Sequence, residues 1–199
     1  MDKYEFNIKV EQIKKMVSRG DYETAMKIAD TIDWHRVRNA SLLSMIAEIY
    51  EKNKEYQEAK DILLLAFERA PIGKRLLYKL TDLALKEGNV AEAEAYYREF
   101  CDLAQDDSRQ YLLRYLILKA KKAPLDQLIR ALETYTAVEV DEKWLYELAE
   151  LYHKGGMGDQ CVRTCDKIML LFGLGKYVEK AMDLKLEYEP LNKYQMDLV

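Results

Sequence analysis

The chain has 199 residues, of which 33% are charged and 49% hydrophobic, and its formal net charge is −4. With only three prolines, this composition predicts a mostly helical protein that forms one domain or one continuous array. The acidic balance argues against a nucleic-acid partner, because such binding depends on a basic surface.

Residues 1–12 lack the apolar core of a secretory signal, and no segment approaches the length of a membrane span. The three cysteines show no disulfide-framework spacing, which indicates a reducing compartment. We therefore expect a cytoplasmic protein with no membrane partner.

The strongest pattern is a period of 34 residues, seen at Ala25, Ala59 and Ala93. A fixed period of this size is typical of helical-hairpin arrays. A turn column recurs at the same spacing, and glycine suits it because helices often end in a left-handed residue. This column consists of Gly20, Lys54, Gly88, Lys122 and Gly156. We expect five hairpins with these turns, inter-repeat turns near residues 36, 71, 106, 140 and 174, and no strands.

Repeat 1 is weak in its first helix and clear in its second, where Ala25 and Ala29 lie one turn apart. Repeat 2, Ser41–Pro71, has a complete apolar stripe on both helices, and Pro71 ends the second one. Its stripe residues are Leu43, Ile46, Ala47, Tyr50, Ala59, Leu63 and Ala66. The alanines at 59 and 93 predict sites where two helices approach closely.

Repeat 3 matches repeat 2 nearly as well, and repeat 5 is a fair match, with Cys161 and Cys165 in core columns. Repeat 4 is the poorest match. Its second helix fits only after a shift of one residue, with Pro124 at the start of the helix. The residues that then face inward are Leu128, Leu132 and Tyr135.

After repeat 5, residues 177–188 predict a further helix, with Tyr177, Ala181, Leu184 and Tyr188 on its apolar stripe. Residues 190–199 then resemble the Pro-Leu start of the second helix of repeat 4. We expect an incomplete sixth repeat, and hence a chain that is an N-terminal piece of a longer array or multidomain protein. The alternative is that residues 177–188 cap the array and the tail folds back.

The stripe of repeat 2 resembles the tetratricopeptide repeat (TPR), of the bacterial type, at every consensus position. The resemblance extends as five repeats over residues 6–175, with 176–199 as a cap or partial sixth repeat, in a single array over 1–199. It implies an all-α fold, a right-handed superhelix of antiparallel helix pairs (an α-solenoid), whose first helices line a concave groove. It also implies a protein-interaction scaffold that binds a peptide or partner segment in this groove.

Three columns of the first helices lie opposite the inward stripe at 100° per residue. Their apolar members gather in repeats 3 to 5, and an exposed apolar patch usually marks a contact site. The predicted partner-binding residues are Met45, Tyr78, Lys79, Leu112, Leu113, Leu116 and Tyr146. A further column predicts a basic groove edge of Arg75, Arg109 and Lys143. Together they predict a partner segment with acidic and apolar side chains.

Three alternatives stand beside this interpretation. Repeat 4 could rotate and bury its leucines, because its helix is slipped by one residue. The basic column could be a set of ordinary solvated cations. The protein could also be a structural module that forms a homo-oligomer through the same patch or an array end.

No group of residues assembles a nucleophile, a base and an oxyanion donor, so we expect no enzyme activity. The best metal-like grouping is His153, Cys161 and Cys165, but a structural zinc site needs four ligands. Both cysteines also occupy core columns, where a free cysteine packs as a small hydrophobe. Gly173–Lys176 lacks the spacing of a phosphate loop and predicts a turn. We predict no metal and no cofactor.

Overall fold

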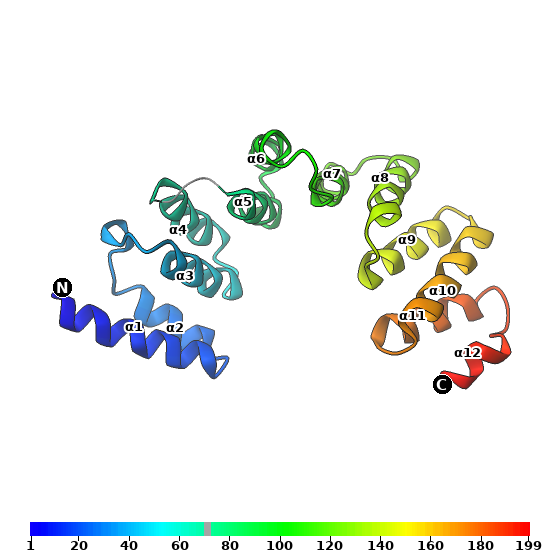
Figure 1. Ribbon diagram of the computed structural model, residues 1–199, viewed down its shortest axis with the longest axis horizontal. Coiled ribbons are helices and arrows are strands. Elements are labelled where there is room, and N and C mark those ends of the chain that lie inside the picture. The colour runs from blue at the N-terminus through cyan, green and yellow to red at the C-terminus, as the bar shows by residue number, and fades with distance from the viewer. Residues whose placement is uncertain (70–72) are drawn as a thin grey trace. The chain divides into compact units, whose positions relative to one another are not determined.

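The computed structural model describes residues 1–69 and 73–199, and every regular element in these ranges is a helix (Figure 1). The first ten α-helices pair along the chain as five hairpins. These are α1 (Lys3–Ser18) with α2 (Tyr22–Ala29), α3 (Ala40–Lys52) with α4 (Tyr56–Arg69), α5 (Lys74–Glu87) with α6 (Val90–Leu103), α7 (Arg109–Ala120) with α8 (Leu125–Val138), and α9 (Glu142–Lys154) with α10 (Gly158–Phe172). The 3-10 helix η1 (Trp34–Arg36) precedes α3, and α11 (Lys176–Leu186) and α12 (Lys193–Asp197) follow α10. The predicted all-α class of paired helices is confirmed.

The turn column predicted from the sequence is visible in the backbone. All five of its residues have φ between 57° and 86°, in the left-handed region. A Cβ built at Gly20, Gly88 or Gly156 would meet no heavy atom within 4 Å. Glycine is therefore favoured at these three turns by the backbone conformation rather than by crowding. Lys54 and Lys122 adopt the same conformation with a side chain, at φ of 61° and 57°.

The turns between hairpins follow the predicted rhythm, with helices ending before residues 106, 140 and 174 and restarting after them. The turn near residue 36 is longer, because residues 30–39 include η1 between α2 and α3. The turn expected near residue 71, and the helix end expected at Pro71, lie outside the described residues.

The chain divides into two compact units, which we call the N-terminal unit (residues 1–105) and the C-terminal unit (residues 106–199). Each unit has a hydrophobic core of its own. Within each unit, successive helices pack against one another in chain order, and α11 also packs against α9. This serial packing is typical of helical-repeat proteins.

The predicted core columns are correct. All stripe residues of repeat 2 are buried, and Ala59 and Ala93 are fully inaccessible to solvent. In repeat 4, Leu132 and Tyr135 are buried and Leu128 packs against the core, as the one-residue shift predicts. Pro124 is the N-cap of α8, whose first residue is Leu125.

Two tyrosines in one repeat column tie neighbouring hairpins together. The hydroxyl of Tyr50 donates to Asp30 at 2.7 Å, and that of Tyr152 donates to Glu133 at 2.5 Å. Each bond joins the first helix of a hairpin to the second helix, or its C-cap, of the hairpin before it. Burial, together with the hydrogen bond, raises the pKa of both tyrosines above the ordinary range.

A buried lysine joins two hairpins of the N-terminal unit. The side chain of Lys60 is 3% exposed and binds Glu87 and, at 2.9 Å, Glu92, so it joins α4 to the α5–α6 turn. Burial disfavours its ammonium form, but the hydrogen bonds to these two carboxylates prevail and raise the pKa of Lys60.

Residues 176–199 complete the C-terminal unit. Ala181 and Leu184 of α11 are buried as predicted, whereas Tyr188, expected on the same stripe, is exposed. The short helix α12 begins with a capping box made by Asn192 and Gln195. The buried amide of Gln195 accepts from Lys185 at 2.8 Å. Leu191 and Leu198 pack against the core, so the tail folds back onto the unit.

Candidate partner-binding cleft

Two of the predicted groove residues in the N-terminal unit are already engaged by neighbouring side chains. Lys79 pairs with Glu51 at 2.5 Å and with Asp82 at 3.6 Å. The ring of Tyr78 lies 6.1 Å from that of Phe100, and Tyr78 is half-buried. Arg75 is exposed on the first turn of α5. A partner that binds repeat 3 would therefore find the charge of Lys79 already balanced by these two carboxylates.

Two predicted groove residues in the C-terminal unit are buried, which corrects the prediction. Leu112 is 5% exposed and Leu113 is fully buried, so neither can contact a partner. The reason is that α7 carries apolar side chains on nearly its whole circumference, so its inner and outer faces cannot be told apart by pattern. The alternative, burial of the leucines of repeat 4, holds for these two residues. Leu116 is half-buried and packs against the core.

The predicted basic edge is also altered by local contacts. The guanidinium of Arg109 holds Asp107 through two hydrogen bonds, of 2.8 Å and 3.1 Å. The ammonium of Lys143 lies 4.8 Å from the ring centroid of Trp144. A role of Arg75, Arg109 and Lys143 in partner binding stays a prediction.

Tyr146 belongs to an aromatic and basic cluster on α9 and α11. Its ring lies 6.1 Å from that of Tyr177, and the Lys180 ammonium lies 5.7 Å and 5.4 Å from the two ring centroids. Lys180 occupies the repeat column of Tyr146, and Tyr177 occupies that of Lys143. The half-buried Tyr146 thus remains a candidate for partner contact.

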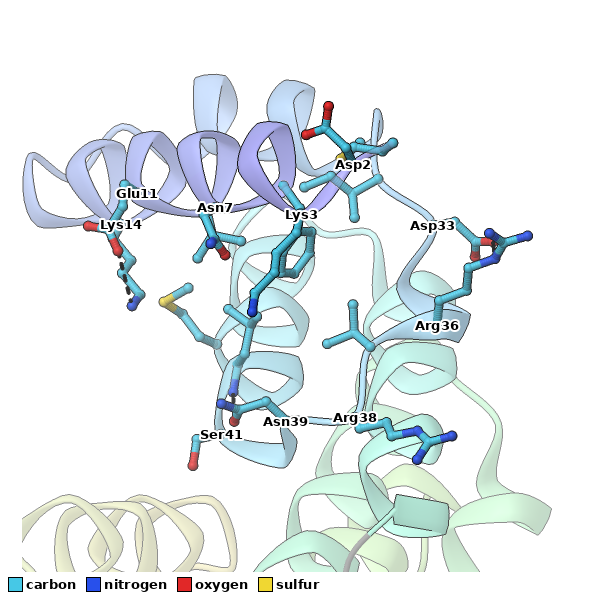
Figure 2. A pocket seen from close by; sticks show the side chains of 17 residues that line it. Asp2, Lys3, Asn7, Glu11, Lys14, Asp33, Arg36, Arg38, Asn39 and Ser41 are labelled. Carbon is cyan, nitrogen blue, oxygen red and sulfur yellow. Dashed lines mark hydrogen bonds and ion pairs between the residues drawn. The ribbon is translucent and has the colours of Figure 1, made fainter.

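The N-terminal unit contains a cleft of about 800 Å³ between α1 and the start of α3, closed on one side by the loop before α3 (Figure 2). Part of its helical lining comes from the columns predicted to face the groove, namely Val10, Glu11, Lys14 and Met45. Asn7 and Ser41, which also line it, lie two repeats and one repeat before Arg75 in the column predicted to form the groove edge. The cleft therefore lies on the predicted groove face of repeats 1 and 2. Of the predicted partner-binding residues, Met45 lines the cleft.

The floor of the cleft is apolar and its rim is charged. Its apolar lining consists of Met1, Phe6, Val10, Ile32, Val37, Leu42 and Met45. Figure 2 shows Lys3 extending from α1 toward Asn39, whereas the side chain of Arg38, on the loop before α3, extends away from Lys3. Within the described part of the chain, neither Lys3 nor Arg38 has an ion-pair partner.

The carboxylates that line the cleft are engaged locally. Glu11 pairs with Lys14 at 3.6 Å, and Asp33 pairs with Arg36 at 3.7 Å. Asp2 accepts from the backbone N–H of Glu5 at 2.7 Å and so caps α1. The backbone N–H of His35 holds the pKa of Asp33 below its usual range. Two of these three carboxylates are therefore balanced by neighbouring cations, which leaves Lys3 and Arg38 as lining cations without an ion pair among the described residues.

The loop of residues 30–39 forms the wall that the repeat pattern did not predict. Asp33 caps η1 and Asn39 caps α3 by accepting from the backbone N–H of Leu42 at 3.1 Å. Trp34 between them is buried, and its indole N–H donates to the carbonyl of Ala29 at 3.0 Å. In the sequence, one capping residue before the tryptophan and one after it are the signal that could have predicted this loop as a wall of the cleft.

His153, Cys161 and Cys165, the grouping that was weighed and rejected as a metal site, lie in the C-terminal unit. Cys161 and Cys165 are fully buried, and burial raises the pKa of both thiols. His153 bonds the hydroxyl of Tyr188, with the two rings in a T-shaped contact 5.5 Å apart. Among the described residues, no three histidine, cysteine or acidic side chains gather as metal ligands. Gly173–Lys176 forms the turn into α11, as predicted.

No family model matches the chain, and no curated protein matches it. Several solved structures share its fold. A tetratricopeptide repeat protein from Parabacteroides merdae ATCC 43184 has a TM-score of 0.67 at 16% identity, with 99% of this chain and 84% of that chain covered. MamA (residues 41 to the end) from Desulfovibrio magneticus RS-1 has a TM-score of 0.60 at 16% identity, with 92% and 96% covered.

A third similar structure is YrrB, which is described as a TPR protein with an unusual peptide-binding site. Its TM-score is 0.54 at 17% identity, with 90% of this chain and 89% of that chain covered. These likenesses show the fold, a TPR-like arrangement of helical hairpins. No helix among residues 1–69 and 73–199 is long and apolar enough to cross a bilayer.

Proposed function

Since the chain is a TPR-like array of helical hairpins, we propose that it is a protein-interaction module whose N-terminal cleft binds a segment of a protein partner. The observation that carries this proposal is the cleft itself. It combines an apolar floor with two unpaired cations, Lys3 and Arg38, on α1 and on the loop before α3. The likeness to YrrB, with its peptide-binding site, supports the same class of role.

The chemistry of the cleft selects the partner segment. Burying one large apolar side chain supplies about 1.5–3 kcal/mol, whereas micromolar binding needs about 8 kcal/mol. The partner must therefore place several apolar side chains on the floor. A carboxylate on the segment would be attracted by Lys3 and Arg38, and this complementary charge gives orientation and a faster association rate.

This role involves no catalysis and no cofactor. We place it in the cytoplasm, because all three cysteines are free thiols, as is usual in a reducing compartment. The half-buried Tyr78, Leu116 and Tyr146 are secondary candidates for partner contact.

Charge reversal at the rim tests the proposal. A partner captured from the native host is reduced to its binding segment by peptide scanning, and the affinity of that segment is measured by fluorescence anisotropy. We expect Lys3→Glu with Arg38→Glu to weaken binding at least tenfold and to reduce its salt dependence. A second variant, Ser41→Trp, fills the cleft from an exposed position and should abolish binding without a change in charge.

The matched control is Lys167→Glu with Arg163→Glu on α10. Both side chains are exposed, and neither has an ion pair within the described residues. Equal loss of binding in the control and the rim variant would refute the assignment of the cleft. If the wild-type chain self-associates in sedimentation velocity and the rim variant does not, the occupant of the cleft is a second copy of this chain.

A further inference from the structure

A second and smaller pocket lies between α7 and α8, within the C-terminal unit. Its volume is about 240 Å³. Tyr111, Arg114 and Leu118 line it from α7, at the i, i+3, i+7 spacing of one helix face. Gln127, Arg130, Ala131 and Thr134 line it from α8 at the equivalent spacing. Two matching helix faces therefore meet across the pocket.

The charge of this pocket is exclusively positive. Arg114 and Arg130 line it from opposite helices, and none of its lining residues is acidic. Neither arginine has an ion-pair partner in the described part of the chain. Arg109, five residues before Arg114 on α7, is by contrast held by Asp107 at 2.8 Å. Arginine remains protonated at any physiological pH, so this positive charge is permanent.

The surroundings of the two guanidinium groups suit an anion. Gln127 and Tyr111 also line the pocket, and both side chains carry hydrogen-bond donors. Leu118 and Ala131 contribute apolar lining. Thr134 is already engaged, because its hydroxyl donates to the carbonyl of Arg130 at 2.9 Å.

We propose that this pocket binds a single phosphate monoester group. A carboxylate has two oxygens, enough for one bidentate arginine pair, whereas a phosphate monoester has three terminal oxygens and nearly two negative charges. It can therefore engage both guanidinium forks at once. The volume accommodates a tetrahedral anion with a short side chain, but not an extended peptide. The group is presented either by a phosphorylated side chain of a protein or by a free phosphate compound.

Titration of the full chain tests the proposal. The signals of the arginine Nε–H groups are followed by NMR while inorganic phosphate, a phosphoserine tripeptide, its unphosphorylated form or acetate is added. We expect saturable one-to-one shifts of the Arg114 and Arg130 signals with phosphate and phosphoserine only. Tighter binding of the tripeptide assigns the site to a phosphorylated protein, and tighter binding of inorganic phosphate assigns it to a free phosphate compound.

Substitutions complete the test. We expect Arg114→Gln and Arg130→Gln each to weaken phosphate binding at least tenfold. The control Arg163→Gln, at an exposed and unpaired arginine of α10, should stay within twofold of the wild type. Thermal melting verifies that each variant is folded, which we expect because both pocket arginines are exposed. Absence of saturation, equal shifts with acetate, or equal losses in the control would each overturn the proposal.

Discussion

Replacing the left-handed lysines of the turn column by glycine should stabilise the protein. Lys54 and Lys122 have φ of 61° and 57°, a conformation that costs a residue with a Cβ about 1–2 kcal/mol. Glycine removes this strain. Its greater conformational freedom in the unfolded chain, however, stabilises the unfolded state by about 0.4–1 kcal/mol. We expect a net gain of about 1 kcal/mol for Lys54→Gly and for Lys122→Gly.

Urea denaturation, followed by circular dichroism, measures the effect. With a slope of about 2 kcal/mol per molar urea, a gain of this size raises the midpoint by about 0.5 M. The same substitution at Lys167, which is exposed in the interior of α10, should lower stability by about 1 kcal/mol. The reverse change, Gly88→Lys, should also destabilise, although the space around Gly88 is open. If Lys54→Gly and Lys122→Gly lower the midpoint as Lys167→Gly does, the backbone argument is wrong.

Three further outcomes are expected. Ala59→Leu should lower the free energy of unfolding by about 1–3 kcal/mol, because Ala59 is fully buried and a larger side chain there would overpack the core; an unchanged urea midpoint would contradict the close helix contact. Burial opposes ionisation of Glu51, but hydrogen bonds from Lys79 and Lys86 prevail and lower its pKa. Glu51→Gln should therefore destabilise the protein at pH 7, and this effect should shrink as the pH falls from the ordinary glutamate pKa of about 4.3 through the lowered pKa of Glu51. A destabilisation that does not shrink over this fall in pH would show another cause. A thiol reagent should label Cys101 first, because it is half-buried, whereas the other two thiols are fully buried with raised pKa values; Cys101→Ser should then remove the fast phase of labelling.

The fold could be predicted from the sequence because its determinants are local and repeat. A left-handed turn residue and an apolar stripe each depend on a few neighbouring residues. A period of 34 residues then presents the same evidence five times. Even the weakest case, α8, was placed correctly by its Pro124 start and its shifted stripe.

The binding surface was harder to predict, because exposure and charge depend on contacts between hairpins. Lys79 is neutralised by Glu51, which lies 28 residues earlier, in the preceding first helix. Leu113 lies on a helix that is apolar on nearly every side. Its position around the helix axis therefore does not indicate that it is buried. The main cleft depends on the capped loop before α3, which interrupts the repeat pattern and is invisible to an argument from columns.

The serial packing of hairpins has a mechanical consequence. Within each unit, helices contact mainly their neighbours in the chain, so a pulling force can detach one hairpin while the contacts of more distant hairpins persist. A released repeat of 34 residues adds at most about 110–120 Å of extended chain. Tension applied through a bound partner would then lengthen the protein in regular steps, and the repeat that gives the sequence its period would also set the size of each step.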